Sequence, residues 1–396
     1  MKVVIAPDSF KSSLNSQAAT ECIVKGIKRV DAAIQTAAIP IADGGEGTVK
    51  NLVAALSGRI FEARVRGPLG EDVPGFYGIL NDGETAVLEI AAASGIELYK
   101  NSIPDPFRAS TYGTGQLIRE ILSKGCRRLI IGLGGSATND GGAGIAQALG
   151  ARFFDAFEHE LPLGGKALLD LKRIDISGMP PALHGIEVIA ACDVTNPLCG
   201  PNGASAIYGR QKGATPGMIA VLDRALENYA SVIKKDLDLD VAEIPGAGAA
   251  GGTGAGLVAF CQASLKPGID IICDLVDFER QIRDADLIIT GEGKIDGQTC
   301  QGKAVYGLAK RAKKYNVPII VLTGSVDTAS IENFYAMGIT AIFNINPTLT
   351  HLSEAISRTS ENIEFTVSQL TRLITRFDHS QGKKNTGEKR GVADGC

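Results

Sequence analysis

Short apolar runs alternate with helical patterns at both ends of the chain. Residues 3–6 and 37–41 are apolar, and a polar or glycine-rich stretch follows each of them before a helical pattern begins. The same alternation returns near the C-terminus, where the pattern predicts strands at 287–290, 318–322 and 341–344 and helices at 302–313, 331–337 and 352–374. Alternation of this kind is typical of a parallel sheet covered by helices on both faces.

The middle of the chain has a different pattern. It contains a hairpin-like pair of strands, two further strands and a helix, which we place at 62–65, 75–80, 86–90, 129–131 and 114–123. We therefore predict an α/β protein with two domains. The first is a flavodoxin-like parallel-sheet domain built from both chain ends, 1–60 plus 284–377, although the sequence alone does not fix its strand order. The second is a mixed α/β domain inserted at 61–283, and the nearly apolar-free residues 378–396 should form a disordered tail.

Charge and composition narrow the function classes. The 396 residues include 40 basic and 44 acidic side chains, a net charge of −4, with no basic block in the main body, which argues against nucleic acid or a membrane surface as the principal partner. The uncharged stretch 244–265 is long enough to span a membrane, but its six glycines and Pro245 would make a poor helix. The eight cysteines form no Cys-x-x-Cys pair and no secretory signal is visible, so we expect a cytoplasmic protein with reduced thiols. The sequence does not indicate an oligomeric state.

The 48 glycines are the most distinctive part of the composition, at about 12% against a usual level of roughly 7%. Three glycine patterns approach known nucleotide-binding fingerprints, and each departs from its template. The pattern at 246–251 follows no strand, and the one at 132–137 runs into 139–142 where a helix should continue. The third pattern, at 297–304, ends in an alanine that cannot offer a hydroxyl group to magnesium.

A pentapeptide Asp-Gly-Gly-x-Gly occurs twice, at 43–47 and 140–144, each time between an apolar strand and a helix. Successive glycines let backbone N–H groups converge on an anion, and the aspartate could hold a cation or accept a proton. The alternative is a tight turn in which the aspartate caps the helix. A third glycine-rich stretch, 291–297, stands at another predicted strand end. Because open α/β sheets bind ligands at the carboxyl ends of their strands, the three stretches together favour a functional role.

Asp193 is the strongest candidate for acid–base chemistry. It follows the apolar run 186–190, so its carboxylate would emerge from a buried strand and could take a proton from a substrate hydroxyl. A turn or cap role is the alternative. The four histidines have no nucleophile nearby, and a serine or cysteine triad has no support.

Other polar residues cluster at predicted strand ends. Lysine at a strand end can act as a point charge for a phosphate oxygen, and a guanidinium near a helix N-terminus suits a carboxylate. These candidates are Asp8, Ser9 and Lys11 after the first strand, Arg64 and Arg66 in the hairpin, Arg108 ahead of Ser110 and Thr111 at a helix start, and Asn196 just beyond Asp193. For any single arginine, a plain surface role is the alternative.

Six ordered motifs give the chain a resemblance to a known family. They are APDSFKSSL (6–14), PIADGGEGT (40–48), STYGTGQLI (110–118), GLGGSATNDGGAG (132–144), CDVTNPL (192–198) and ITGEGKIDGQT (289–299). In this order they resemble the bacterial glycerate kinases of the glycerate 2-kinase type. The resemblance covers residues 1 to about 377. It implies ATP-dependent phosphorylation of D-glycerate, a requirement for Mg²⁺, and an active site in the cleft between two α/β domains.

The resemblance also suggests a role for each candidate. Asp193 would be the base and Lys11 a phosphate contact, and Asp43, Glu292 and Asp296 would bind Mg²⁺ directly or through water. The anion site would be lined by Gly134, Gly135, Ser136, Asn139, Asp140, Gly291 and Gly293. Arg64, Arg66 and Arg108 would bind the glycerate carboxylate. The expected product is 2-phosphoglycerate, with 3-phosphoglycerate as the alternative that no single residue excludes. A non-catalytic metabolite-binding protein and a nucleotide-dependent dehydrogenase are the rival functions.

Overall fold

The computed structural model describes residues 1–10, 12–39, 41, 47–99, 103–296, 304–328, 331–348 and 351–387. The chain divides into two compact units, Met1–Ile41 with Ile272–Cys396, and Ala42–Ile271. These divisions differ from our expected boundaries at 60/61 and 283/284. The first difference arises because helix α2 (Thr48–Ala55) packs on strands of the second unit. At the second boundary, residues 272–283 group with the first unit.

Five parallel strands form the sheet of the first unit. Their bounds are Lys2–Ile5 (β1), Gln35–Ala38 (β2), Leu287–Ile295 (β11), Ile319–Val326 (β12) and Ala341–Asn344 (β13). The sheet order is β13-β12-β11-β1-β2, and every neighbouring pair is parallel. Numbered within this unit alone, the order reads 2-1-3-4-5, which is the flavodoxin-like order. The predicted fold class is confirmed for this unit.

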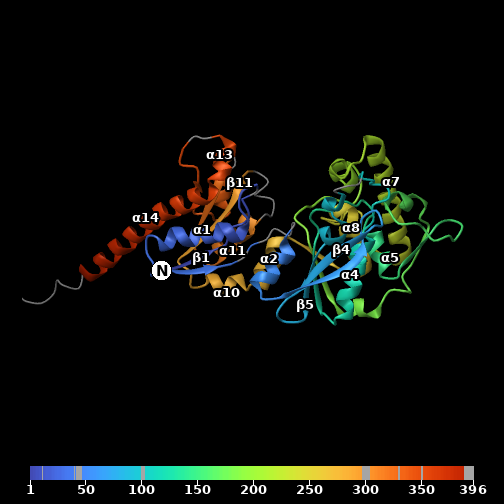
Figure 1. Cartoon of the computed structure of the whole chain (residues 1–396), viewed down its shortest axis with the longest axis horizontal. Coiled ribbons are helices and arrows are strands. Elements are labelled where there is room, and N and C mark those ends of the chain that lie inside the picture. The colour runs from blue at the N-terminus through green and yellow to red at the C-terminus, as the bar shows by residue number, and fades with distance from the viewer. Residues whose placement is uncertain are drawn as a thin grey trace, which may run out of the picture. The chain divides into compact units, whose positions relative to one another are not determined.

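Helices α1 (Ser16–Lys28) and α14 (Thr359–Gly387) lie side by side in the first unit (Figure 1). Gly26 permits their close approach, because a Cβ atom at this position would lie 2.8 Å from the carbonyl oxygen of Glu364. Val367 of α14 joins the same apolar core as the strands. The other helices associated with this unit are Gly268–Leu275 (α9), which crosses the division between the units, Phe278–Ile282 (α10), Ala304–Lys314 (α11), Ile331–Ala336 (α12) and Leu352–Ser357 (α13).

Strand β11 is longer than the sequence predicted. We expected the strand to end at Thr290 and 291–297 to form a loop, but β11 continues to Ile295 beside β12. A Cβ atom at Gly291 would lie 2.5 Å from the carbonyl oxygen of Leu322 on that neighbouring strand. Glycine at position 291 therefore allows two strands to approach closely, and the expected strand-end loop was wrong up to Ile295.

The predicted helix 352–374 is divided into α13 and α14. Arg358 separates them, with φ of −101° and ψ of 8°. Helix α14 then continues to Gly387. Residues 378–387 of the expected disordered tail are therefore helical, and 388–396 lie outside the described residues.

A six-stranded mixed sheet forms the second unit. Its order is β10-β9-β6-β5-β4-β3, in which β5, β6, β9 and β10 are parallel and β3 and β4 are antiparallel to their neighbours. The strands are Arg59–Arg66 (β3), Asp72–Ile79 (β4), Thr85–Glu89 (β5), Arg128–Gly132 (β6), Glu187–Ala191 (β9) and Ser264–Lys266 (β10). The predicted hairpin and the mixed α/β class of this unit are confirmed.

The helices of the second unit pack against one large core. The α-helices beyond α2 are Ala91–Ser94 (α3), Tyr112–Ser123 (α4), Ala143–Ala148 (α5), Ala204–Tyr208 (α6), Pro216–Leu237 (α7) and Ala249–Cys261 (α8). Short 3₁₀ turns include Ile96–Tyr99 (η1) and Arg210–Lys212 (η4). The ring of Tyr229 on α7 stacks on Phe260 of α8, and Phe153 meets both rings.

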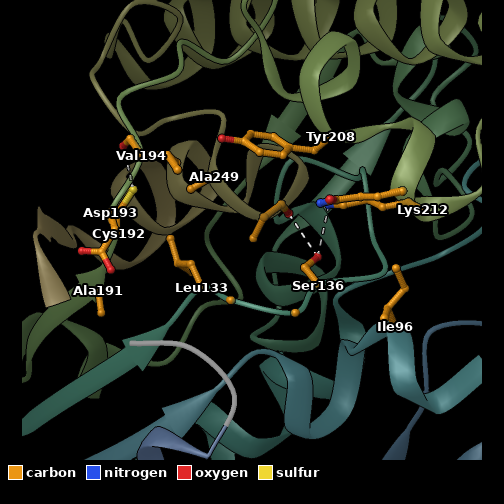
Figure 2. Close-up of a pocket in the computed structure, with 14 residues that line it drawn as sticks. Ile96, Leu133, Ser136, Ala191, Cys192, Asp193, Val194, Tyr208, Lys212 and Ala249 are labelled. Carbon is orange, nitrogen blue, oxygen red and sulfur yellow. Dashed lines mark hydrogen bonds between the residues drawn. The ribbon is translucent and has the colours of Figure 1, made fainter. Parts of the chain in front are cut away.

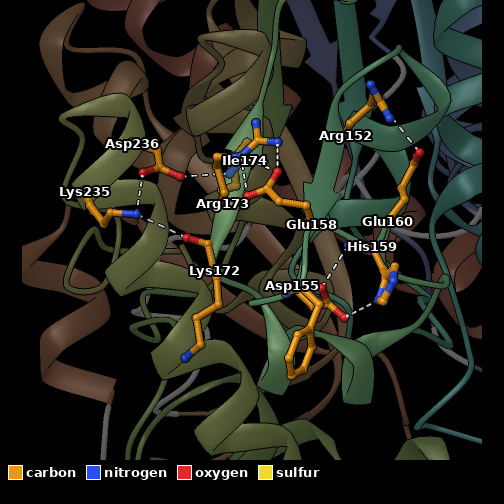
Figure 3. Close-up of polar contacts among 11 residues, drawn as sticks. Arg152, Asp155, Glu158, His159, Glu160, Lys172, Arg173, Ile174, Lys235 and Asp236 are labelled. Atoms are coloured by element: carbon orange, nitrogen blue, oxygen red, sulfur yellow. Dashed lines mark hydrogen bonds and ion pairs between the residues drawn. The ribbon is translucent and has the colours of Figure 1, made fainter.

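A two-stranded ribbon, β7 (Arg152–Phe154) and β8 (Arg173–Asp175), carries a polar network on the surface of the second unit (Figure 3). The guanidinium groups at the start of each strand lie over the ring of Phe154, 4.7 Å and 4.0 Å from its centre. Asp236 at the end of α7 accepts a hydrogen bond of 2.8 Å from the backbone N–H of Ile174, which ties the ribbon to that helix.

Within the described ranges, no helix has both the length and the apolar character that crossing a membrane requires.

Candidate active site

A cavity of about 480 Å³ lies in the second unit, where β6 and β9 end (Figure 2). The two strands are adjacent and parallel, with Gly132 opposite Ala191. The chain leaves both strands at the same edge of the sheet, which is where open α/β sheets bind ligands. The segments that leave them line the cavity together with Ile96, Tyr208, Gln211, Lys212, Ala249 and Ala250.

The 134–136 turn brings backbone N–H groups to this cavity. Gly135 has a φ of +72°, which glycine adopts without strain. The N–H of Ile96 donates to the carbonyl oxygen of Gly135, and the N–H of Ala137 donates to that of Ser94, both at 2.9 Å. Within the described part of the chain, none of the three backbone N–H groups of the turn donates to a protein acceptor. Unpaired N–H groups beside a cavity can bind an anion.

Asp193 follows β9 and lines the same cavity. Its Oδ1 accepts a hydrogen bond of 2.8 Å from the backbone N–H of Gly268, the first residue of α9, which fixes the carboxylate. The side chain is exposed, so a substrate can reach it. A fixed and accessible carboxylate of this kind can orient a hydroxyl group and accept its proton. The structure thus brings together Asp193, Gly134, Gly135 and Ser136 among the predicted site residues.

The thiol of Cys192 also lines the cavity, beside Asp193. It donates to the carbonyl oxygen of Val194 at 3.2 Å, and burial raises the pKa of the thiol above its usual value. A nucleophilic cysteine needs a lowered pKa, so this thiol is not prepared for covalent chemistry.

Lys212 is a charged cavity residue that the sequence analysis missed. It belongs to the short 3₁₀ turn η4 and is 2% exposed, although it lines the cavity. Its Nζ donates to the carbonyl oxygen of Thr138 at 2.6 Å and lies 3.5 Å from the Oγ of Ser136. Burial lowers the pKa of this lysine from 10.5 to about 7, and the charge of Asp140 opposes the shift. Figure 2 shows Lys212 and Asp193 on opposite sides of the cavity.

Tyr208 covers another side of the cavity and connects it to Asn196. The phenol donates to the Oδ1 of Asn196 at 2.7 Å, and the amide of Asn196 donates to the carbonyl oxygen of Asn202 at 2.8 Å. Asn196 is therefore one contact away from the cavity. Its predicted role as a direct substrate ligand stays a prediction.

Helix α8 reaches the cavity through a distorted first turn. Ala250, Gly251 and Gly252 have φ values of 53°, 70° and 88° in place of helical ones. Ala250 lines the cavity, and its carbonyl oxygen accepts hydrogen bonds from the hydroxyl groups of Thr253 and Ser136. A non-glycine residue in the left-handed region carries strain, and such residues concentrate at functional sites.

Asp140 does not line the cavity, although we expected it in the anion site. Its carboxylate is fully buried and accepts hydrogen bonds of 2.8 to 3.2 Å from the backbone N–H groups of Thr111, Gly142 and Gly144 and from the hydroxyl of Thr111. The glycines of 140–144 therefore do converge on an anion, but that anion is their own aspartate. This is the tight-turn alternative, in which the aspartate organises the loop before α5.

Most of the other predicted residues of this unit lie away from the cavity. Asn139 is buried and its amide donates to the hydroxyl of Ser205 at 2.9 Å, and Ser110 is buried beside Thr111. Arg64 and Arg66 are exposed on β3, where the latter lies 4.9 Å from the centre of the Tyr112 ring, and Arg108 is exposed in a loop. None of these five side chains lines the cavity.

A further group of predicted residues lies in the first unit, at the carboxyl edge of the flavodoxin-like sheet. Asp8 follows β1, and its backbone N–H donates to the carbonyl oxygen of Gly291 at 2.9 Å. Ser9 is its neighbour, and β11 carries Gly293 and Glu292 with Asp296 directly after it. The carboxylate of Asp296 lies 3.1 Å from the Nζ of Lys294. Lys11 and Asp43 lie outside the described residues.

Glu89 is a second residue that the sequence analysis missed. It ends β5, is 4% exposed, and accepts hydrogen bonds from the backbone N–H groups of Gly47 at 3.1 Å and Val49 at 2.6 Å. A carboxylate at a helix N-terminus satisfies unpaired N–H groups and the helix dipole, so Glu89 caps α2. The signal available in the sequence was a single acidic residue, Glu89, at the end of an apolar strand.

Comparison with known proteins assigns this chain to a family. Residues 3–375 match the Glycerate kinase family. The chain belongs to the glycerate kinase family. It is 49% identical over 374 residues to the glycerate kinase of Bacillus subtilis (strain 168), covering 94% of this chain and 98% of that one. It is also 49% identical over 363 residues to the glycerate 2-kinase of Escherichia coli (strain K12), covering 92% and 95%.

A solved structure from the glycerate kinases is also similar to this chain. The crystal structure of a chain assigned as glycerate kinase 2 from Salmonella typhimurium LT2 matches this one with a TM-score of 0.85 and 46% identity, covering 96% of this chain and 99% of that chain. A glycerate kinase is a phosphotransferase, and the kinase family implies ATP as its phosphoryl donor. The resemblance stated from the six motifs is confirmed.

Proposed function

We propose that this chain transfers the γ-phosphoryl group of ATP to the 2-hydroxyl of D-glycerate, which yields 2-phosphoglycerate and ADP. The observation that carries the proposal is that one cavity joins Asp193 to the 134–136 turn. Phosphoryl transfer needs a carboxylate that orients the nucleophile and N–H donors that stabilise charge. The names of the relatives, glycerate kinase and glycerate 2-kinase, support the choice of acceptor and of hydroxyl.

In this proposal the chemistry is a single displacement. The 2-hydroxyl oxygen of glycerate forms a bond to the γ-phosphorus, the bond from that phosphorus to the bridging oxygen of ADP breaks, and the hydroxyl proton passes to Asp193. The N–H of Gly268 holds the carboxylate that receives it. The backbone N–H groups of the 134–136 turn bind oxygens on which negative charge is spread in the transition state.

We propose Mg²⁺ as the metal, held by Asp43, Glu292 and Asp296 directly or through water. The donor chemistry fits, since Mg²⁺ prefers carboxylate oxygens and is usually bound by one or two of them with water and phosphate oxygens. In the described ranges, no three acidic, histidine or cysteine side chains form a ready cluster. When bound, the metal would neutralise phosphate charge.

The proposal predicts ADP release that depends on D-glycerate. ADP formation should be measured in a coupled assay with ATP and Mg²⁺, with and without D-glycerate, and the product should be identified by phosphorus NMR or by its conversion with enolase. We expect little ADP without glycerate and 2-phosphoglycerate as the product. A product identified as 3-phosphoglycerate would contradict the choice of hydroxyl, and an absence of glycerate-dependent turnover would contradict the function.

The same assay separates the two rival functions. A metabolite-binding protein would bind glycerate without releasing ADP, and a dehydrogenase would consume glycerate only with a nicotinamide cofactor. The 134–136 turn gives no support to the second rival, because its glycine pattern is followed by the buried Asn139 and Asp140 where a dinucleotide-binding helix should run.

A further inference from the structure

Lys212 is exceptional among the basic side chains of the protein. Of the lysines and arginines in the described residues, it alone is buried, with 2% of its surface exposed. An isolated charge is costly to bury, so a buried ammonium group is usually paired with a carboxylate. No carboxylate oxygen of the described residues lies within 4.0 Å of its Nζ atom. Among the described residues, the charge of Lys212 is therefore uncompensated at close range.

The hydrogen bonds of Lys212 leave donor capacity for a ligand. An ammonium group has three N–H donors. The carbonyl oxygen of Thr138 takes one at 2.6 Å, and the Oγ of Ser136 takes at most one more at the long distance of 3.5 Å. Among the described residues no third acceptor is present. Because Lys212 lines the cavity, a ligand there can supply the missing acceptor.

The surroundings of Lys212 select the kind of acceptor. Ser136, which its Nζ atom approaches, belongs to the 134–136 turn, whose backbone N–H groups are also unpaired within the described residues. An ammonium group and several N–H groups on one wall of a cavity form a site for an anionic oxygen. Asp193 lies on the opposite side in Figure 2, so the anion would bind away from that carboxylate.

We propose that Lys212 is a catalytic residue whose ammonium group binds an anionic oxygen of a reactant in this cavity, together with the 134–136 turn. The inference rests on the proposed function. Two reactants carry such oxygens: the nucleotide, in its phosphates, and glycerate, in its carboxylate. A cation in a site shielded from water stabilises negative charge far more than one at the surface, and the low dielectric strengthens the contact.

Lys212→Met tests this role because methionine keeps the length of the side chain and removes its charge. Lys212→Gln keeps a donor for the carbonyl oxygen of Thr138, so it separates loss of the charge from loss of that structural bond. The matched control is Lys124→Met, at an exposed position at the end of α4. Each variant should be checked for folding by circular dichroism and thermal unfolding before its kinetics are compared.

We expect both Lys212 variants to lose turnover on the order of a hundredfold or more, and Lys124→Met to match the wild type. Calorimetric titration with ADP and with D-glycerate, each alone, then identifies the anion, because the ligand that Lys212 binds should lose affinity in both variants. In Lys212→Ala, added propylammonium should restore part of the turnover, which a purely structural lysine would not allow. A folded variant with wild-type turnover and wild-type affinity for both ligands would overturn the inference.

Failure of the proposed function and failure of the Lys212 role give different results. If the wild type shows no glycerate-dependent ADP release, the proposed function fails, while the ADP titration still reports on Lys212. If the wild type turns over glycerate and Lys212→Gln does so equally well, only the role of Lys212 fails.

Discussion

Lys212 and Asp140 are both buried. Burial lowers the pKa of Lys212 and raises the pKa of Asp140, and each shift favours the neutral form of the side chain. Asp140 is compensated by four N–H and O–H donors and therefore organises its loop. Lys212 has one short hydrogen bond and faces a cavity. Two equally buried residues thus have different roles, a structural one for Asp140 and ligand binding for Lys212. The number of hydrogen bonds that each side chain makes within the protein distinguishes them.

The lowered pKa of Lys212 predicts a characteristic dependence of stability on pH. Its folded pKa is about 7 against 10.5 ordinarily, so between these values the unfolded chain binds a proton that the folded chain does not. The free energy of unfolding should therefore rise with pH across this window. Asp140 is the charge that acts on Lys212, and Tyr208, Cys192 and Asp193 share its cavity.

Urea unfolding at pH 7 and pH 9 measures this effect. Relative to Lys212→Met, the wild type should gain about 1–3 kcal/mol in unfolding free energy between the two pH values. Using the difference between the two proteins cancels the contribution of every other titrating group. An identical pH dependence in both would show that Lys212 keeps an ordinary pKa in the fold.

At the level of single residues, the sequence could single out Asp193 and the 134–136 turn, which line one cavity, because each comes shortly after an apolar strand. Lys212 could not be found in this way. It lies in a 3₁₀ turn 76 positions beyond Ser136, and nothing in the local pattern shows that it is buried. Asp140, expected in the anion site, lies outside the cavity lining, since its glycine-rich pattern is the same whether the N–H groups face a ligand or their own carboxylate.

At the scale of elements, glycine has three different uses that the sequence does not separate. In the 134–136 turn it leaves N–H groups without a partner among the described residues beside a cavity, whereas at Gly291 it lets β11 and β12 pack closely. The start of α8 adds a third case, in which Gly251 has a φ of +70° and abuts the carbonyl group of Thr138. That carbonyl is the one to which Lys212 donates.

Gly251→Ala should therefore disturb both the start of α8 and the cavity. A Cβ atom at this position would lie 1.9 Å from the carbonyl oxygen of Thr138, and the left-handed backbone conformation disfavours alanine in any case. We expect a loss of at least about 2 kcal/mol in unfolding free energy, measured by urea titration.

Gly217→Ala is the control for this substitution. Gly217 lies in the first turn of α7, where an added Cβ atom would meet no atom within 4 Å. This variant should stay within about 1 kcal/mol of the wild type, on the stabilising side. Equal effects of the two substitutions would show that close contact at Gly251 does not limit stability.

At the scale of the whole molecule, the strand–helix alternation at both chain ends was enough to predict a unit built from two distant segments. Five short parallel strands in the order 2-1-3-4-5 satisfy that pattern. The positions of the divisions were less predictable, because the helical pattern of α2 does not reveal which sheet the helix will cover. The helix packs on β3, β4 and β5, and this depends on tertiary contacts that the local sequence pattern does not encode.

The second unit alone brings together a carboxylate, a glycine turn and a buried cation in one cavity. The central claim is that this cavity performs the phosphoryl transfer, with Asp193 receiving the proton. Asp193→Asn tests it most directly, because the substitution preserves shape and removes the base. Glu187→Gln is the matched control, on the same strand β9, where an exposed ion pair with Arg128 contributes little.

The decisive measurement is glycerate-dependent ADP release by these two variants, with the fold of each verified by circular dichroism. We predict that Asp193→Asn binds ADP and glycerate but loses a factor of at least about 100 in kcat, and that Glu187→Gln matches the wild type. A folded Asp193→Asn enzyme with near-wild-type kcat would contradict the assignment of this cavity as the catalytic site.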